Sequence, residues 1–224
     1  MRAVLLLAVS AAVLTPAPAP AQPGSAAPAD GLAAIAAAAP GCAAERAYCF
    51  AIQLHVASTE QGLVVDPAWV AGQLARANRH FAEIDVGFQV AGVKPLPASA
   101  AHVATRADRT RLASRRGRRV IDVFVTGRLD DVDEPDKQIR GVAWRHDGRK
   151  YIILSATAWD FVLTHELGHF FGLPHSAYDI SLMNKRPRIA PAFEQRTFAP
   201  EELAAMRPVV RRLVREKVVQ NHAR

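Results

Sequence analysis

The stretch from Thr164 to Asn184 constrains this chain more than any other part of its sequence. It contains the pattern H-E-x-x-H-x-x-G-x-x-H, and a methionine follows the last histidine after eight residues. The positions are His165, Glu166, His169, Gly172, His175 and Met183. An ordinary amphipathic helix rarely matches so many fixed positions by chance, so the pattern indicates a site with its own chemistry.

The spacing of the histidines indicates a metal site. Residues four apart on a helix are neighbours, so His165 and His169 can offer two ring nitrogens to one ion. Gly172 suits the end of that helix, because glycine adopts the left-handed conformation at low steric cost, and Pro174 prevents helical continuation. The chain can then turn back and bring His175 to the same ion. Three nitrogen ligands and one open position are typical of catalytic zinc.

Glu166 lies next to the first ligand, where a carboxylate can take a proton from the zinc-bound water. The whole set resembles the metzincin zinc endopeptidases, and it is most similar to matrixins, which also carry a serine after the third histidine, as Ser176 here. The resemblance implies that the three histidines bind zinc and that Glu166 is the general base. It also implies that Met183 lies in a tight Met-turn beneath the metal without ligating it. Lys185 stands where some metzincin branches place an extra tyrosine ligand, which argues against those branches.

The expected function is a secreted zinc-dependent metalloendopeptidase that acts on protein or peptide substrates. One alternative is a pappalysin-like metzincin, although the methionine normally lies further from the third histidine in that branch. The other alternative is a zinc-fold module that binds an anionic envelope polymer without turnover. An intact Glu166 argues against this second alternative, because a pure binder needs no base.

The N-terminal residues predict export. Arg2 precedes an apolar run, and Ala19-Pro20-Ala21 is a small-x-small cleavage site, so residues 1–21 resemble a signal peptide. We expect a secreted or periplasmic protein with no membrane span after cleavage, with an uncleaved anchored segment as the alternative. Residues 22–47 are rich in alanine and proline and predict a linker or N-terminal segment, in which 33–39 can form a short helix. Residues 48–224 form the predicted catalytic domain.

Cys42 and Cys49 are the two cysteines of the chain. An even number in an exported protein favours a disulfide, which here closes a small loop. The alternative is a latency switch, in which a free thiolate upstream of the catalytic domain caps the zinc, as in matrixins. The residues that flank Cys42 do not reproduce the matrixin prosegment motif, so we favour the disulfide.

Hydrophobic periodicity predicts the order of the elements. Strands are expected at 48–57, 86–93 and 119–126, with helices at 67–82 and 100–116 between them. This alternation requires crossover connections and therefore a mostly parallel sheet. The segments 141–145 and 151–154 predict a hairpin around Asp147-Gly148.

The metzincin resemblance makes one strand of this hairpin an antiparallel edge strand above the cleft, which can hold an extended peptide. The active-site helix is expected to be capped by Ser155 or Thr157 and to end near Phe171. A last helix is expected from Pro200 to about Val219. The predicted fold class is α/β (α+β), a metzincin-like zincin with a twisted, mostly parallel five-stranded sheet, an antiparallel edge strand, an active-site helix, a Met-turn and a C-terminal helix.

The chain has a formal charge of +7, and its densest basic cluster runs from Arg106 to Arg119. This cluster is expected to be a solvated helix face, with an anionic surface or polysaccharide as the alternative partner. No aromatic residues interleave with the arginines, so a specific nucleic-acid function is not indicated. The acidic segment 129–137 is interpreted as a solvated loop, with calcium as the alternative ligand, because its spacing matches no known calcium loop.

Overall fold

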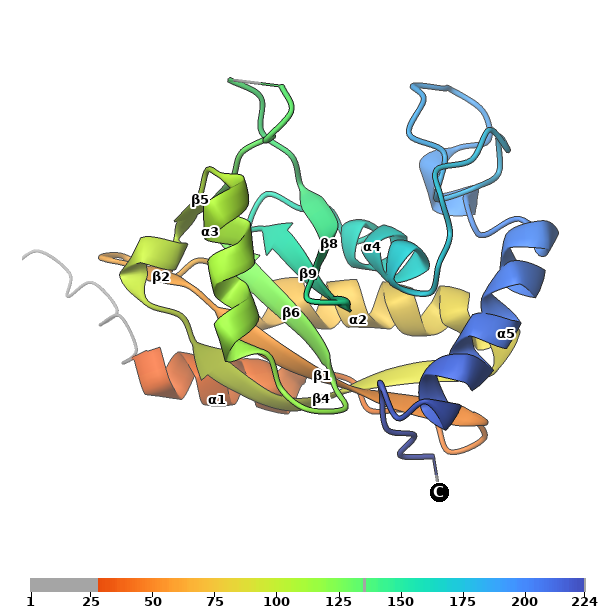
Figure 1. The fold of residues 1–224 in the computed structure, drawn as a ribbon, viewed down its shortest axis with the longest axis horizontal. Coiled ribbons are helices and arrows are strands. Elements are labelled where there is room, and N and C mark those ends of the chain that lie inside the picture. The colour runs from red at the N-terminus through yellow and green to blue at the C-terminus, as the bar shows by residue number, and fades with distance from the viewer. Residues whose placement is uncertain (1–27, 135, 224) are drawn as a thin grey trace, which may run out of the picture.

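Five strands form the central sheet in the order β4-β1-β6-β9-β8 (Figure 1). The computed structural model describes residues 28–134 and 136–223, so the predicted signal peptide lies outside the described residues. Neighbouring strands are parallel except at one edge, where β8 runs antiparallel to β9. The mostly parallel sheet with an antiparallel edge strand is therefore confirmed. The strands are β1 (Tyr48–Val56), β4 (Val86–Pro95), β6 (Ile121–Thr126), β8 (Gly141–His146) and β9 (Arg149–Ser155).

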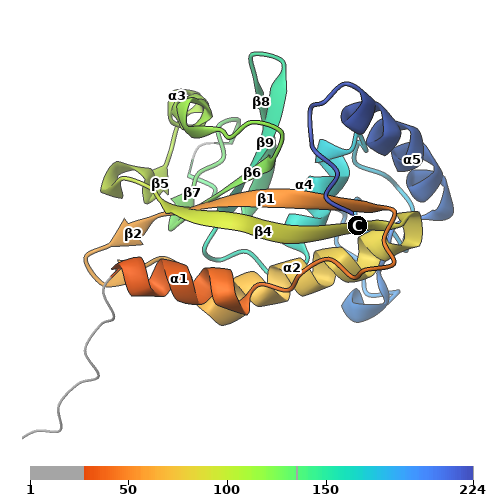
Figure 2. The same ribbon diagram turned by 90° about the horizontal axis from the view of Figure 1, so that it is seen from below.

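Three helices cover one face of this sheet: α1 (Pro28–Ala38), α2 (Pro67–Phe81) and α4 (Val162–Phe170). Figure 2 shows α1 and α2 side by side against β1 and β4. Helix α2 begins as predicted, since the Asp66 carboxylate accepts a hydrogen bond from the Trp69 N–H at 2.7 Å and Pro67 occupies the first turn. No helix among the described residues combines the length and apolar character that crossing a bilayer requires.

Helix α1 lies in the segment 22–47, which was expected to be a linker or N-terminal segment, and it starts before the short helix expected at 33–39. Its sequence is mostly alanine, the best helix former, and Ile35 is fully buried against the core. The helix packs against both α2 and β4. This segment therefore belongs to the folded domain, and residues 22–27 lie outside the described part of the chain.

The opposite face of the sheet is covered by shorter elements, and here the predicted helix at 100–116 is only partly present. Helix α3 spans only Arg106–Arg111, because Thr105 and Asp108 form a capping box that sets its start. A 3-10 turn, η3 (Leu112–Arg115), follows it. Before the helix, β5 (His102–Val103) pairs in parallel with β7 (Arg128–Leu129). His102 and Val103 therefore pair with a distant strand, although local propensity predicts that they are helical.

The remaining elements are short, apart from the last helix. They are β2 (Ser58–Thr59), β3 (Gly62–Leu63), and the 3-10 turns η1 (Ala82–Ile84), η2 (Ala98–Ala100) and η4 (Phe193–Gln195). The last helix, α5 (Pro200–Arg215), ends before the expected Val219. Lys217 has a φ of 57°, and the chain then returns to the sheet, where the His222 N–H donates to the Cys49 carbonyl at 2.8 Å. Pairing with β1 thus replaces the last helical turn.

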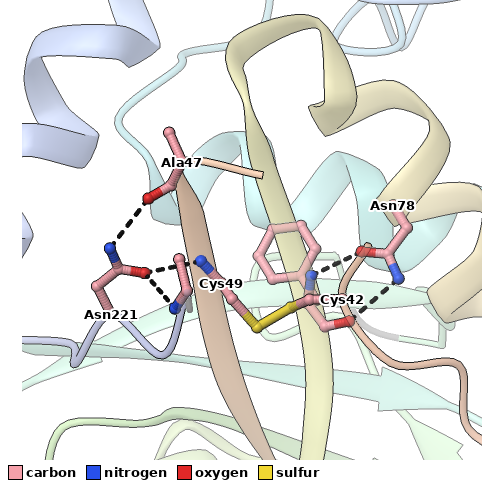
Figure 3. The surroundings of a disulfide bond; sticks show 7 residues. Cys42, Ala47, Cys49, Asn78 and Asn221 are labelled. Carbon is pink, nitrogen blue, oxygen red and sulfur yellow. Dashed lines mark hydrogen bonds between the residues drawn. A yellow bond between two sulfur atoms is a disulfide. The ribbon is translucent and has the colours of Figure 1, made fainter. Parts of the chain in front are cut away.

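Cys42 and Cys49 are joined by a disulfide, and no free cysteine remains in the described part of the chain (Figure 3). The bond ties the segment before β1 to the start of β1. Asn221 closes the same region from the other terminus, since its side-chain oxygen accepts a hydrogen bond from the Cys49 N–H at 2.8 Å. Its amide nitrogen donates to the Ala47 carbonyl at 3.0 Å. In this arrangement neither sulfur is available as the free thiolate that a latency switch needs.

His80 couples the stability of the fold to pH. The side chain is 5% exposed, lies between Phe161 and Phe198, and has a buried Nε2 without a hydrogen-bond partner. Burial, reinforced by Arg79 and Arg76, lowers its pKa to about 4. In the unfolded chain the imidazole binds a proton near its ordinary pKa of about 6.5. The contribution of His80 to stability is therefore complete above that value and is lost as the pH falls toward about 4.

We expect the wild-type protein to lose about 1–2 kcal/mol more stability than His80→Gln between about pH 7 and pH 5. Glutamine keeps a polar group at the site but does not titrate, and every other histidine is common to both proteins. Urea denaturation at the two pH values measures the difference. Equal pH dependence in the two proteins would show that His80 is not buried in its neutral form.

Candidate metal centre and cleft

Helix α4 presents two of the three motif histidines away from the sheet. Leu163, Leu167 and Phe170 are buried against the core, as expected, while His165 and His169 are only half-buried. Their spacing of four residues places both imidazoles on the same face of the helix. Local sequence and the apolar face of α4 therefore orient both rings toward the cleft.

The predicted cap of α4 is wrong. Ser155 and Thr157 hydrogen-bond to each other at 3.0 Å. The N–H of Leu163 instead donates to the Gln73 side-chain oxygen from α2 at 3.0 Å. Gln73 is 2% exposed, and its amide nitrogen donates to the carbonyls of Ala158 and Trp159. A residue distant in sequence thus satisfies the start of the helix, which local sequence could not reveal.

Replacing Gln73 with leucine is expected to destabilise the fold by about 2 kcal/mol, because it leaves the buried Leu163 N–H without a partner. It also removes one of the hydrogen bonds that the Ala158 and Trp159 carbonyls accept. Chemical denaturation measures the loss. Gln61→Leu is the matched control, since Gln61 is exposed in the turn between β2 and β3. A Gln73→Leu protein as stable as this control would contradict the capping role.

Gly172 ends α4 as its position in the motif predicts. It has a φ of 100°, in the left-handed region that favours glycine. The Leu173 N–H then donates to the Gly168 carbonyl at 2.9 Å, and Leu173 is buried. The chain reverses at this point and carries His175 back beside the helix.

Ring nitrogens of the three histidines lie within 4.8 Å of one another. The Nε2 atoms of His169 and His175 are 3.3 Å apart. The Nδ1 atoms of His165 and His169 are each 2.7 Å from a backbone carbonyl oxygen, that of Leu182 and that of Leu173. These bonds assign the proton to Nδ1 and leave the Nε2 lone pair for a metal, which is the arrangement seen in metal-binding histidines.

The electrostatics of the site suit a cation. Burial lowers the pKa of His165 to about 4, and it also lowers the pKa values of His169 and His175. All three rings are therefore neutral at pH 7, which is the form that binds metals. Three neutral nitrogen donors that converge on one point fit Zn²⁺ with an open fourth position.

Glu166 is 5% exposed, and its Oε2 atom is buried without a hydrogen-bond partner. Burial raises the pKa of this carboxyl to about 8, while the Ala143 backbone N–H and the Arg109 charge oppose that rise. A divalent cation held by the histidines would favour the ionised form further. A buried carboxyl group without a hydrogen-bond partner calls for an explanation. Beside three histidines, Glu166 is suited to exchange a proton with a bound molecule.

Met183 is fully buried, packs close to Gly168 of α4 and is tied to the last helix. Its backbone N–H donates to the Ser181 Oγ at 2.8 Å, and that hydroxyl lies 2.7 Å from both carboxylate oxygens of Glu202 in α5. This network also holds the Leu182 carbonyl that accepts from His165. Glu202 is 6% exposed and was not identified from the sequence, because an acidic residue in a first helical turn is also explained by the helix dipole.

Gly168 is a second residue that sequence reasoning missed. A Cβ built there would lie 2.5 Å from the Met183 sulfur and 3.2 Å from Phe198. Only glycine lets the methionine pack this closely against α4. The sequence did contain a signal for this contact. A glycine inside a helix lowers helix stability by about 1 kcal/mol relative to alanine, so its presence there suggests that close packing requires it.

Two hollows meet at the histidines and share Gly141, His165 and Glu166. One contains His169 and His175, and the other is walled by the segment that follows Met183. Strand β8 borders both hollows, and one side of it is not paired within the sheet. A Cβ on Gly141 would lie 3.0 Å from Glu166, so glycine lets the strand pass close to the carboxylate.

Arg109 and Arg116 of the 106–119 run point into the fold, which corrects the solvated face predicted for the run at these two positions. The other arginines of the run are exposed, as predicted: Arg106, Arg111, Arg115, Arg118 and Arg119. Arg109 is 3% exposed, donates to the Asp130 carbonyl at 2.7 Å and lies 5.0 Å from the Trp144 ring centre. Arg116 donates to the His146 carbonyl at 2.8 Å. These guanidinium groups connect α3 and η3 to the hairpin of β8 and β9.

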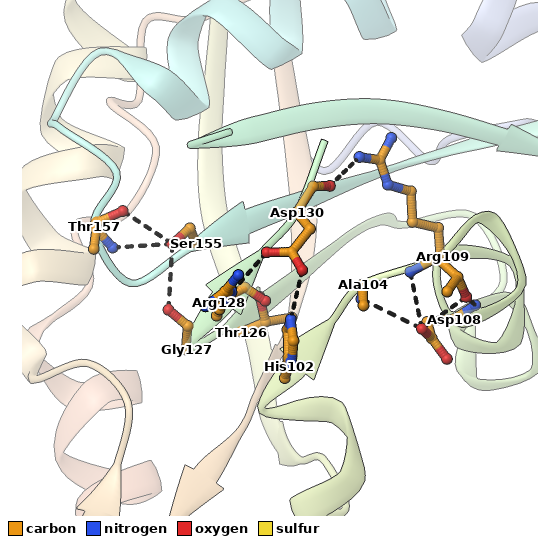
Figure 4. Close-up of polar contacts among 11 residues, drawn as sticks. His102, Ala104, Asp108, Arg109, Thr126, Gly127, Arg128, Asp130, Ser155 and Thr157 are labelled. Carbon is orange, nitrogen blue, oxygen red and sulfur yellow. Dashed lines mark hydrogen bonds and ion pairs between the residues drawn. The ribbon is translucent and has the colours of Figure 1, made fainter. Parts of the chain in front are cut away.

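The acidic segment 129–137 is paired with cations (Figure 4). The Asp130 carboxylate contacts His102 at 2.8 Å and Arg128 at 2.7 Å, and Asp133 pairs with Arg106. Within the described residues, the histidine triad is the one group of three or more potential ligands that converges on a point. The structure therefore offers no support for calcium at this segment.

Comparisons with known proteins relate this fold to metallopeptidases. No family model and no curated protein sequence matches the chain. The crystal structure of metalloproteinase-II from Bacteroides fragilis matches with a TM-score of 0.54 and 11% identity, over 76% of this chain and 56% of that chain. Archaemetzincin from Methanopyrus kandleri matches with a TM-score of 0.49, 19% identity and coverage of 74% and 98%. A zinc-dependent peptidase from Methanocorpusculum labreanum (strain Z) matches with a TM-score of 0.42 and 16% identity, over 69% of this chain and 99% of that chain.

The first of these matches identifies the fold. At this level of identity the match shows shared architecture, and this chain spans 56% of the length of the Bacteroides fragilis protein. The chain therefore has a metalloproteinase-like α/β fold. What such a fold does in this chain has to be argued from its own site.

Proposed function

We propose that this chain is an exported zinc-dependent endopeptidase of the metzincin type. One observation carries the proposal: three histidine ring nitrogens converge within 4.8 Å of one another beside the unpartnered, buried Oε2 of Glu166. The unpaired edge of β8 borders the same place. Ligands, base and peptide-binding edge are the three parts that metal-assisted hydrolysis of an extended chain requires.

The residues of this chain have distinct roles in the proposed reaction. Zinc, when bound, supplies a Lewis acid that polarises a carbonyl and acidifies water. His165, His169 and His175 would hold it through Nε2, with the Leu182 and Leu173 carbonyls fixing two of the rings. Glu166 accepts a proton from the attacking water and passes it to the leaving amine, which its burial close to the histidines allows. Strand β8 orients the peptide through backbone hydrogen bonds.

The short run from His175 to Met183 supports a matrixin-like arrangement over a pappalysin-like one. Binding of an anionic polymer through residues 106–119 has less support, because Arg109 and Arg116 donate to backbone carbonyls inside the fold and Arg106 pairs with Asp133. Export is supported by the signal-like residues 1–21 and by the Cys42–Cys49 disulfide, which persists in oxidising compartments.

Cleavage of a quenched generic peptide library by the exported, purified protein tests the proposal. We expect turnover that a chelator abolishes and added zinc restores. Zinc bound at one ion per chain without cleavage of any library peptide would count against peptidase function. Salt-sensitive polyanion binding under those conditions would favour the binding-module alternative.

A further inference from the structure

The hollow on the side of the segment that follows Met183 is strongly basic. Its wall includes the aromatic rings of Trp159, Phe161 and Phe193, and it shares His165 and Glu166 with the metal centre. Glu166 is the one acidic residue in this lining. Three cationic side chains line it as well: Arg140, Arg188 and Arg196.

No carboxylate neutralises these three arginines within residues 28–134 and 136–223, since none has an acidic oxygen within 4.0 Å. Arg188 instead donates to the backbone carbonyls of Asp179, Ser181, Asn184 and Arg186. Carbonyl groups orient a guanidinium but carry no net charge. The positive charge of Arg188 therefore has no salt-bridge partner beside the hollow, and the Asp179 carboxylate acts on it only from beyond 4.0 Å.

The other two arginines are held by aromatic rings. The Arg140 guanidinium carbon lies 4.1 Å from the Trp159 ring centre, and that of Arg196 lies 5.3 Å from the Phe193 ring centre. Trp159 and Phe193 pack edge to face, with their centres 5.9 Å apart. Arg196 also donates through Nε and Nη2 to the carbonyls of Pro191 and Arg188, at 3.2 and 2.9 Å. Stacking leaves the N–H edge of Arg140 free to bind an anion, since its guanidinium donates no hydrogen bond within the described residues. Apolar walls also strengthen the attraction between these charges and an anion, because they lower the local dielectric.

We propose that this hollow selects a carboxylate on a substrate residue next to the scissile bond. The inference rests on the proposed function, since His165 and Glu166 border the hollow and place its occupant next to the reacting bond. A neutral apolar side chain would fit the aromatic walls but would leave three cations without an anion. Two sources supply the same chemistry: the side chain of an aspartate or glutamate, and the terminal carboxylate of a short peptide.

Two series of matched peptides test the proposal with the exported, zinc-supplied protein, one varied at the residue before the scissile bond and one at the residue after it. We expect kcat/KM for glutamate to exceed that for glutamine and leucine by about tenfold or more in one of the two series, and lysine to be the poorest there. Each peptide of the second series is made as a free acid and as a C-terminal amide, with the residue either internal or last. Preference for internal glutamate assigns a side chain, whereas loss of cleavage on amidation assigns the terminal carboxylate.

Arg140→Glu is the main variant, because Arg140 is exposed and its guanidinium donates no hydrogen bond within the described residues. We expect it to lower the glutamate-to-glutamine ratio by about tenfold and to improve cleavage of the lysine peptide. Arg196→Gln is a second, milder variant that removes a charge from the same hollow. Arg145→Glu is the matched control, since Arg145 is exposed and lies in a different hollow.

Different outcomes overturn different claims. Equal cleavage of glutamate, glutamine and leucine peptides in both series would overturn the carboxylate preference while the peptidase proposal stands. An equal change in Arg145→Glu and Arg140→Glu would also overturn it, because the effect would then come from overall charge. Absence of cleavage for every peptide, with zinc bound, would overturn the peptidase function and the inference with it.

Discussion

Replacing Glu166 with glutamine is expected to lower peptide hydrolysis by about 10²–10⁴-fold while zinc binding is retained. Glutamine preserves the shape of the side chain but cannot accept the proton that a water nucleophile must lose. The Oε2 atom of Glu166 is buried and unpartnered, and no other carboxylate lines either hollow except Asp131. The Oδ1 atom of Asp131 accepts hydrogen bonds from the backbone N–H groups of Asp133 and Glu134. These bonds lower the pKa of the Asp131 carboxyl, which makes it a weaker base.

Cleavage of the best library peptide and zinc content by elemental analysis give the two readouts for this variant. Glu60→Gln is the control, because Glu60 lies in an exposed turn. Full activity in Glu166→Gln would refute the general-base role. Loss of both zinc and activity would instead mean that Glu166 contributes to holding the metal.

The second large effect is expected for His169→Ala, which should lower zinc affinity by more than about 100-fold. Loss of a residue that only hydrogen-bonds to a metal ligand lowers metal affinity by up to about 100-fold, and loss of a ligand should cost more. His169 Nε2 lies 3.3 Å from His175 Nε2, and its Nδ1 is fixed 2.7 Å from the Leu173 carbonyl. Removing it leaves two ligands, which do not complete a catalytic zinc site.

Competition with a chelator of known affinity measures the loss. His102→Ala is the matched control, because His102 pairs with Asp130 at 2.8 Å, outside the hollows of the proposed site. His102→Ala should keep wild-type affinity. Unchanged affinity in His169→Ala would show that the three rings do not form the metal site.

Local interactions explain why much of the fold was predictable. Asp66 and Pro67 start α2 through a cap and a fixed φ, which depend on adjacent residues only. The Asp147-Gly148 turn has φ values of 48° and 72°, as a tight hairpin between β8 and β9 needs. The parallel sheet follows from the alternation of strands and helices.

Predictions failed where distant segments compete with local preference. The expected helix at 100–116 loses its first residues to pairing between β5 and β7. Helix α5 stops at Arg215 because the chain returns to β1. The basic run predicts that Arg109 is a surface residue, but Arg109 is buried and its guanidinium lies against the Trp144 ring.

The sequence by itself predicted that His165, His169 and His175 converge, because their spacing around a helix and a glycine break is a local property of the chain. It also predicted the mostly parallel sheet with an antiparallel edge strand, against which that helix packs. Only the tertiary structure decided what holds the site in place and what surrounds it: Gln73 at the start of α4, Glu202 behind the Met-turn, and the arginine-lined hollow. These contacts join residues far apart in the chain, and their energies depend on burial and distance, which no local pattern records.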